Sequence, residues 1–99
     1  GLAHPPYTVP EGVPVPTVKI HAMKDPKGGW NLHLETTNFR FAPEKTGQDD
    51  VPGEGHAHLY VNKKKVGRVY GEWFHVTVPK GPNLIKVTLN TNGHKDYYD

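Results

Sequence analysis

The sequence predicts an all-β fold, an antiparallel sandwich of two sheets with about seven or eight strands. Two observations lead to this prediction. Several short segments alternate apolar and polar residues, which is the period of a strand with one buried face. The 11 glycines and 10 prolines among the 99 residues interrupt every window that is long enough for a helix. Short strands between turn residues are therefore expected, and a chain of this length makes one domain.

Three regions are expected along the chain. Residues 1–16 hold five of the ten prolines, and proline fixes φ and lacks the amide donor that a central strand needs. This segment is therefore predicted to be an extended arm or an edge segment. Residues 17–94 are predicted to form the sandwich, and residues 95–99 a polar tail that carries tyrosines.

The alternating segments give the order of the expected strands and their inward faces. Strands are predicted at 17–23, 30–35, 38–43, 55–62, 65–70, 72–78 and 83–90, separated by turns rich in Gly, Pro, Asn and Asp. The apolar positions of these segments form the predicted core: Val18, Ile20, Leu32, Leu34, Leu59, Val61, Phe74, Val76, Ile85, Val87 and Leu89.

Composition excludes several classes of function. Apolar residues are only 34%, and no run of them is long enough to insert into a membrane. The net charge of +2 is small and scattered, which argues against nucleic acid as a partner. The absence of cysteine excludes thiolate zinc sites and a blue-copper centre. Seven histidines are the compositional anomaly, so a metal site here must be built mainly from imidazole and carboxylate.

The strongest candidate site lies on the segment 55–62. Ala57 and Leu59 alternate with His56 and His58, so both imidazoles are expected on the face that does not enter the core. Two imidazoles at this spacing can bind one transition metal, although two solvated histidines on an exposed face would give the same pattern. His94 follows the last strand and can join them if residues 83–90 run antiparallel to this segment. Otherwise water, His75 or a loop carboxylate would complete the site.

A second cluster is expected on the first hairpin. Keeping the apolar side chains of 17–23 and 30–35 on one face places His21 opposite His33, with Met23 diagonally beside His33. These three side chains are a second possible metal site, in which the thioether of Met23 would favour Cu(I). A polar outer face that happens to contain two histidines is the alternative.

The segment 44–54 shows no periodicity and is expected to be a long loop. It carries Asp49, Asp50 and Glu54 directly before His56. These carboxylates are interpreted either as a metal ligand or weak calcium site, or as an ordinary solvated loop.

The sequence from residue 39 onward resembles two groups of exported bacterial domains. Gly-His-Ala-His-Leu at 55–59, Pro-Lys-Gly at 79–81, the alternating strand 85–90 and His94 are similar to an uncharacterised family of periplasmic domains known as DUF4399. More loosely, Phe-Arg-Phe-Ala-Pro at 39–43 followed by a loop and a histidine-bearing strand resembles cupredoxin-like domains. The resemblance implies a sandwich of the immunoglobulin or cupredoxin-like type and a periplasmic or secreted location. Asn83 stands where that family often has another histidine, and neither group supplies a known reaction.

Three functions are weighed on this basis. The first is a metal-binding module for copper, or zinc, built from histidines, with a partner protein as a further possibility for delivery. The second is a non-enzymatic domain without metal that binds a protein or glycan through the exposed aromatics Trp73, Tyr70, Tyr97 and Tyr98. The third is an enzyme, for which a copper oxidase using His4 as the N-terminal ligand is the best case. No catalytic triad order, cysteine nucleophile or phosphate-binding glycine loop appears, so a non-enzymatic function is predicted.

Overall fold

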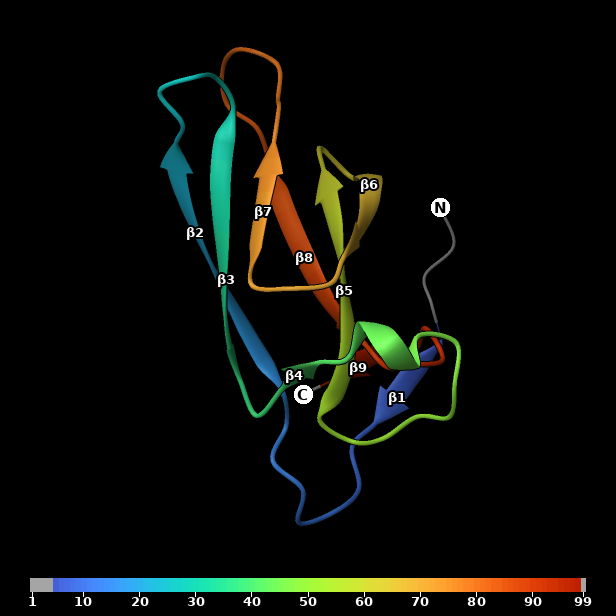
Figure 1. Cartoon of the computed structure of the whole chain (residues 1–99). Coiled ribbons are helices and arrows are strands. Elements are labelled where there is room, and N and C mark those ends of the chain that lie inside the picture. The colour runs from blue at the N-terminus through green and yellow to red at the C-terminus, as the bar shows by residue number, and fades with distance from the viewer. Residues whose placement is uncertain (1–4, 99) are drawn as a thin grey trace.

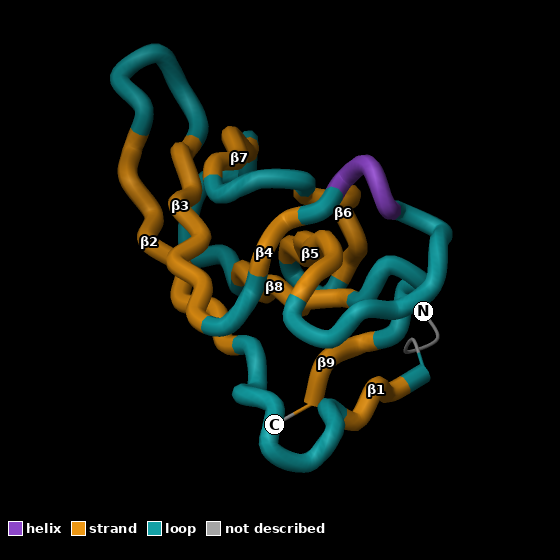
Figure 2. The backbone as a smooth tube through the Cα atoms, turned by 60° about the horizontal axis from the view of Figure 1, so that its bottom comes forward, coloured by secondary structure: helices purple, strands orange, loops and turns teal. Residues whose placement is uncertain are grey.

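The fold was obtained as a computed structural model, which describes residues 5–98. Two sheets lie face to face, as Figures 1 and 2 show from the side and from below, so the predicted sandwich is confirmed. The smaller sheet has the strand order β2-β3-β7, and the larger has the order β1-β9-β8-β5-β4 with β6 also paired to β5. Within residues 5–98, no helix is long and apolar enough to cross a bilayer. The elements are β1 (Pro6–Thr8), β2 (Thr17–Lys24), β3 (Trp30–Thr37), β4 (Arg40–Phe41), the 3-10 helix η1 (Pro43–Lys45), β5 (Glu54–Val61), β6 (Lys64–Val69), β7 (Trp73–Val76), β8 (Ile85–Asn90) and β9 (Asp96–Tyr98).

The smaller sheet is built on the predicted hairpin. β2 and β3 are antiparallel, and their register pairs His21 with His33 as expected. The turn between them is closed by backbone hydrogen bonds between Asp25 and Gly28 and between Asp25 and Gly29. Both glycines have positive φ, which explains why this turn needs them. β7 then pairs with β3 and completes the sheet.

Strand β5 is the centre of the larger sheet. β6 returns antiparallel to it through a two-residue turn at Asn62 and Lys63, whose φ values of 51° and 71° are those of a turn that fits the strand twist. β8 pairs antiparallel with the other edge of β5 over residues 56–61. β4 pairs parallel with the start of β5, where Arg40 is opposite Glu54.

The core between the two sheets contains the predicted apolar residues. Leu32, Leu34 and Leu59 are each 1% exposed, and they lie at its centre. Their burial requires the inward faces of β3 and β5 to face each other, which the alternation already indicated. All eleven predicted positions belong to this core or pack against it.

The two ends of the described chain extend the larger sheet. β1 pairs parallel with β9, so Tyr7 is opposite Tyr97, and their rings meet edge to face at 5.5 Å. Within the segment expected as an extended arm or an edge segment, Pro6–Thr8 thus form an edge strand, where proline is tolerated. The segment expected as a polar tail contains the paired strand Asp96–Tyr98, and the phenol of Tyr97 contacts the backbone of residues 51–54. The sandwich therefore extends beyond the predicted 17–94 boundary at both ends.

Candidate metal centre

The alternation in β5 divides its side chains between two buried environments. Ala57 and Leu59 enter the core between the sheets, as predicted. His56 and His58 occupy the opposite face, yet both are 0% exposed. The interpretation as two solvated histidines is therefore wrong. Burying two imidazoles is costly without compensating polar contacts, so this face must be a specific polar environment.

Cross-strand register defines the neighbours of the two histidines. On the β8 side, His56 is opposite Asn90 and His58 is opposite Thr88. The Thr88 hydroxyl donates a hydrogen bond to the Asn90 Oδ1 at 3.0 Å, and the Asn90 amide donates to the carboxylate of Asp96. Thr88 and Asn90 are thus hydrogen-bonded polar neighbours on the strand next to the two imidazoles.

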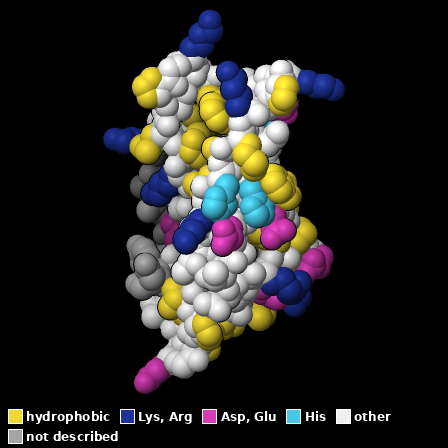
Figure 3. Space-filling view, turned by 90° about the vertical axis from the view of Figure 1, so that its left-hand side faces the viewer, with side chains coloured by type: hydrophobic (Ala, Val, Ile, Leu, Met, Phe, Trp, Pro, Cys, Tyr) yellow, Lys and Arg dark blue, Asp and Glu magenta, His cyan; other side chains and the backbone are white. Residues whose placement is uncertain are grey.

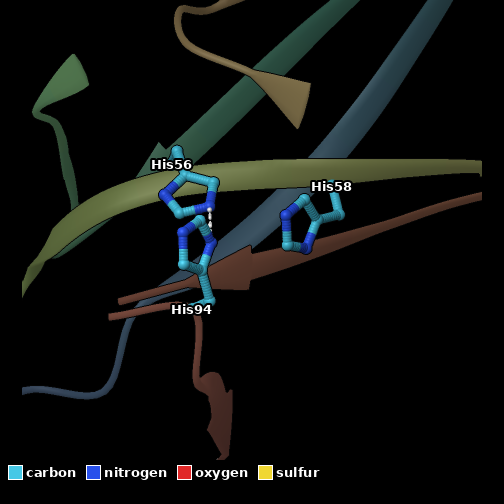
Figure 4. Close-up of side chains that lie close together, drawn as sticks. All are labelled: His56, His58 and His94. Atoms are coloured by element: carbon cyan, nitrogen blue, oxygen red, sulfur yellow. Dashed lines mark hydrogen bonds between the residues drawn. The ribbon is translucent and has the colours of Figure 1, made fainter. Parts of the chain in front are cut away.

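His94 reaches this pair from the loop after β8. β8 runs antiparallel to β5, so its last residues end beside His56, and the condition set for a three-histidine site is met. The Nδ1 of His94 lies 3.1 Å from the Nε2 of His56, and Figure 4 shows the His94 ring pointing toward His56, with His58 beside them. One nitrogen of each ring, from His56, His58 and His94, lies within 4.8 Å of the others.

The donor set fits a transition metal. Three imidazoles with no thiolate suit copper, zinc or nickel, and hard cations such as calcium prefer oxygen ligands. Zinc–imidazole bonds of about 2.0–2.1 Å place the nitrogens of a tetrahedral site about 3.4 Å apart. The three nitrogens lie within 4.8 Å of one another, so they would have to approach one another further to bind a metal in this geometry. Three protein ligands also leave a coordination position for water or another ligand.

The loop that carries His94 is short and held in an unusual conformation. The backbone of Thr91 pairs with both His94 and Lys95, and the hydroxyl of Thr91 accepts a hydrogen bond from the Lys95 amide. This geometry gives His94 a φ of 67°, in the left-handed region, which is uncommon for residues other than glycine although Asn, Asp and His adopt it more often than the rest. A strained histidine of this kind persists only where surrounding contacts fix it.

Carboxylates of the 44–54 loop provide those contacts. Asp50 accepts a hydrogen bond from the Gly93 amide at 2.7 Å and pairs with the Lys95 ammonium at 3.3 Å. Glu54, which is 6% exposed, accepts a hydrogen bond from the amide of the fully buried Asn92 at 3.0 Å. Neither carboxylate belongs to the metal-binding group found among the described residues. They position the His94 loop, so neither the metal-ligand nor the solvated-loop interpretation of the acidic segment holds for these two residues.

Basic groups and hydrogen bonds keep these two carboxyls ionised. Burial alone would raise the pKa of Glu54, but hydrogen bonds from Asn92, Lys45 and Arg40 outweigh it and lower that pKa. Burial also opposes ionisation of Asp50, and hydrogen bonds from the His94 loop and Lys95 lower its pKa in the same way.

The lowered pKa values predict an acid-sensitive loop. A carboxylate with a depressed folded pKa stabilises the fold fully above its unfolded pKa, about 3.9 for Asp. That stabilisation is lost as pH falls through the lower folded value. Asp50→Asn should therefore reduce the free energy of unfolding by about 1–3 kcal/mol at pH 7, and the difference from the parent should shrink as pH falls below about 3.9 and through the lowered folded pKa.

Denaturant unfolding across this pH range measures the effect. Asp49→Asn is the matched control, because Asp49 is the exposed neighbour and only its backbone carbonyl bonds to the loop. Equal stability losses in the two variants would contradict the role given to Asp50.

The second predicted cluster lies on the outer face of the smaller sheet, on the far side of the core. His21 and His33 are adjacent as predicted, with nearly parallel rings whose centroids are 5.9 Å apart. Figure 3 shows two histidines side by side on this face, with acidic side chains directly below them. The Oε1 atom of Glu35 lies 2.7 Å from the His21 Nε2, and the His33 ring stacks on the Trp73 ring with their centroids 4.4 Å apart. Metal binding at this cluster, including the proposed ligand Met23 at 44% exposure, stays a prediction.

His75 does not reach the β5 histidines. It lies on β7 opposite Asn31, and its Nε2 is 2.9 Å from the Gly28 carbonyl oxygen and 3.6 Å from Asp25. It is therefore part of the turn between β2 and β3, and it is not a reserve ligand for the site. His4 lies outside the described residues.

Several residues at the centre carry no local signal in the sequence. Asn92 is fully buried in a loop that looked polar and exposed, and its amide bonds to Glu54 and to the Asp49 carbonyl. Tyr70 lies with its ring 5.9 Å from that of His56, just beyond the end of β6. A regular two-residue turn at Asn62 and Lys63 would place Val69 opposite His56. The register shift in the pairing of β5 with β6, next to Leu59 and Tyr60, brings Tyr70 there instead, and no local pattern in the sequence indicates that shift.

Comparisons with protein-family models, with curated proteins and with solved structures find no match to this chain. The resemblances to the uncharacterised periplasmic family and to cupredoxin-like domains stay predictions. The proposed function therefore depends on the geometry of the site alone.

Proposed function

We propose that this domain is a metal-binding module with copper as its metal and zinc as the second choice, and that it is not an enzyme. The observation that supports the proposal is the convergence of His56 and His58, from strand β5, with His94, from the loop after β8. Two of the three are fully buried, and a loop held by Asp50 and Glu54 carries the third. Such pre-organisation is expected of a binding site and unnecessary for surface histidines.

Copper is preferred on the chemistry of the donors. Imidazole nitrogen suits both Cu(II) and Zn(II), and Cu(II) stands highest in the affinity order of divalent first-row metals. A thiolate is absent, so the module would store, deliver or sense copper and would not carry electrons through a blue centre. A periplasmic or secreted location, where a protein partner could exchange the metal, completes the proposal.

Metal titration of the purified domain tests this function. Addition of Cu(II) at pH 7.5 should give one tight equivalent, and electron paramagnetic resonance should show hyperfine coupling from three nitrogens. Affinity should fall as pH drops through about 6.5, because protons compete for imidazole. Zn(II) should compete for the same equivalent and bind less tightly. A parent protein that takes up no metal, or a spectrum with one nitrogen, would contradict the proposal.

One observation favours an interaction domain as the second candidate. Trp73 is 60% exposed and stacks on His33, which in turn stacks toward His21, so three rings form a row across β7, β3 and β2. Exposed aromatic rows are typical of surfaces that bind proteins or glycans. Tyr97 does not belong to this surface, since burial raises its pKa to about 12 and its hydroxyl bonds to backbone. Loss of partner binding in Trp73→Ala with unchanged metal uptake would separate the two functions.

A further inference from the structure

We infer that Arg68 and Tyr70 form a binding subsite for an oxyanion at the open edge of the histidine site. The inference rests on the proposed metal function, because the anion would occupy the metal's remaining coordination position while it pairs with Arg68. The ligand is thus defined by its chemistry as a carboxylate or phosphate group.

Register places Arg68 at the site. β6 pairs antiparallel with β5 so that Arg68 is directly opposite His58. Side chains of such a pair point to the same face, with Cβ atoms about 4.5–5.5 Å apart. Val69 enters the core next to it, so the alternation of β6 confirms that Arg68 stands on the histidine face.

The guanidinium is hydrogen-bonded to Tyr70, whose ring lies beside that of His56. Its Nη1 donates a hydrogen bond to the Tyr70 hydroxyl at 3.4 Å, and the Tyr70 ring lies 5.9 Å from that of His56. Tyr70 is 41% exposed and Arg68 is exposed, so both groups border solvent at the edge of two buried histidines. Arg68 thus reaches along the strand to Tyr70, the residue next to His56.

Charge around the centre favours an anion. Among residues 5–98, Arg68 forms no ion pair, in contrast to Arg40, which is bound to Glu54. The metal-binding group itself contains three imidazoles and no carboxylate. The carboxylates near the centre are already engaged: Asp96 by the Asn90 amide, Asp50 by Lys95, and Glu54 by Arg40 and Lys45. A bound divalent ion beside Arg68 would therefore leave positive charge that an anionic ligand neutralises.

The two side chains have the geometry that oxyanion recognition uses. A guanidinium presents parallel N–H donors that match the two oxygens of a carboxylate or phosphate. The hydroxyl of Tyr70 accepts its hydrogen bond from Arg68, so its own proton is available to donate to the same anion. An oxyanion on the metal would thus be held at three points, whereas a linear anion such as azide would use the metal alone.

Anion titration of the Cu(II)-loaded domain tests this subsite. Acetate and inorganic phosphate are the probes, azide is the reference anion, and the shift of the copper absorption band reports binding. Arg68→Gln should raise the dissociation constants of acetate and phosphate about tenfold or more and leave azide binding within about twofold. Arg68→Lys should lose part of the affinity, because it keeps the charge and loses the parallel donors. The tighter of the two oxyanions in the parent identifies the ligand class.

Lys86→Gln is the matched control. Lys86 is also an exposed cation on the outer face of this sheet, in the register row beyond His58, where its ammonium lies over the Tyr60 ring. Its removal takes away the same unit charge, so it should change anion affinity by no more than about twofold. Equal effects of the two variants, or a large loss of Cu(II) affinity in Arg68→Gln without anion, would overturn the subsite. A parent that binds no Cu(II) would instead overturn the proposed function.

Discussion

Replacing His56 and His58 together by alanine should lower the affinity for Cu(II) at pH 7.5 by at least about tenfold. The two residues supply two of the three imidazoles of the only such group within the described part of the chain. The double substitution removes two imidazole nitrogens, the type of donor for which Cu(II) has the highest affinity among the divalent first-row metals. Competition with a chelator of known affinity measures the change, and the nitrogen hyperfine pattern should weaken with it. Unchanged affinity would place the metal elsewhere.

A matched control is available on the other sheet. His21→Ala with His33→Ala also removes two neighbouring histidines, and it leaves the β5 site intact. This control should keep the affinity of the parent, whereas a larger loss here than at positions 56 and 58 would move the site to the smaller sheet. His94→Asn removes the third imidazole of the same site. It avoids the cavity that the buried double substitution creates, and asparagine tolerates the positive φ at this position.

The sequence predicts those features that depend on local periodicity. Alternation alone places His56 and His58 on one face of a strand, and no other part of the fold can change that. The demand for one apolar face also sets the β2–β3 register, with His21 opposite His33. The place of His94 was conditional on topology, because only an antiparallel β8 ends beside His56.

Features that arise from distant packing could not be read in this way. Burial of His56 and His58 depends on what covers the outer face of the larger sheet, which periodicity in β5 does not contain. Asp50 and Glu54 look like a solvated acidic run until the chain closes and brings residues 91–95 against them. Parallel pairing of β1 with β9 likewise joins segments about ninety residues apart, and neither segment alternates clearly on its own.

The approach of β5 to the His94 loop depends on Gly55. Its position precedes His56, where the chain passes over the last residue of β8. A Cβ at this glycine would lie 1.8 Å from the Asn90 carbonyl oxygen and 3.1 Å from the Thr91 Cα. These are backbone atoms, so a rotamer change cannot relieve the contact. Gly55 also has a φ of 157°, a value that residues with side chains rarely adopt.

Gly55→Ala should therefore reduce the free energy of unfolding by about 4 kcal/mol or more, a loss reserved for backbone clashes and comparable defects. Urea unfolding at pH 7 measures it, with Gly67→Ala as the control. Gly67 lies in β6, where a Cβ would meet no atom within 4 Å, so alanine there should change stability by no more than about 1 kcal/mol. Folded Gly55→Ala should also bind Cu(II) more weakly, because any shift that relieves the clash moves Thr91 and the His94 loop away from His56. Equal stability of the two variants would mean that β5 and the His94 loop can separate without cost, and the rigid three-histidine site would then be wrong.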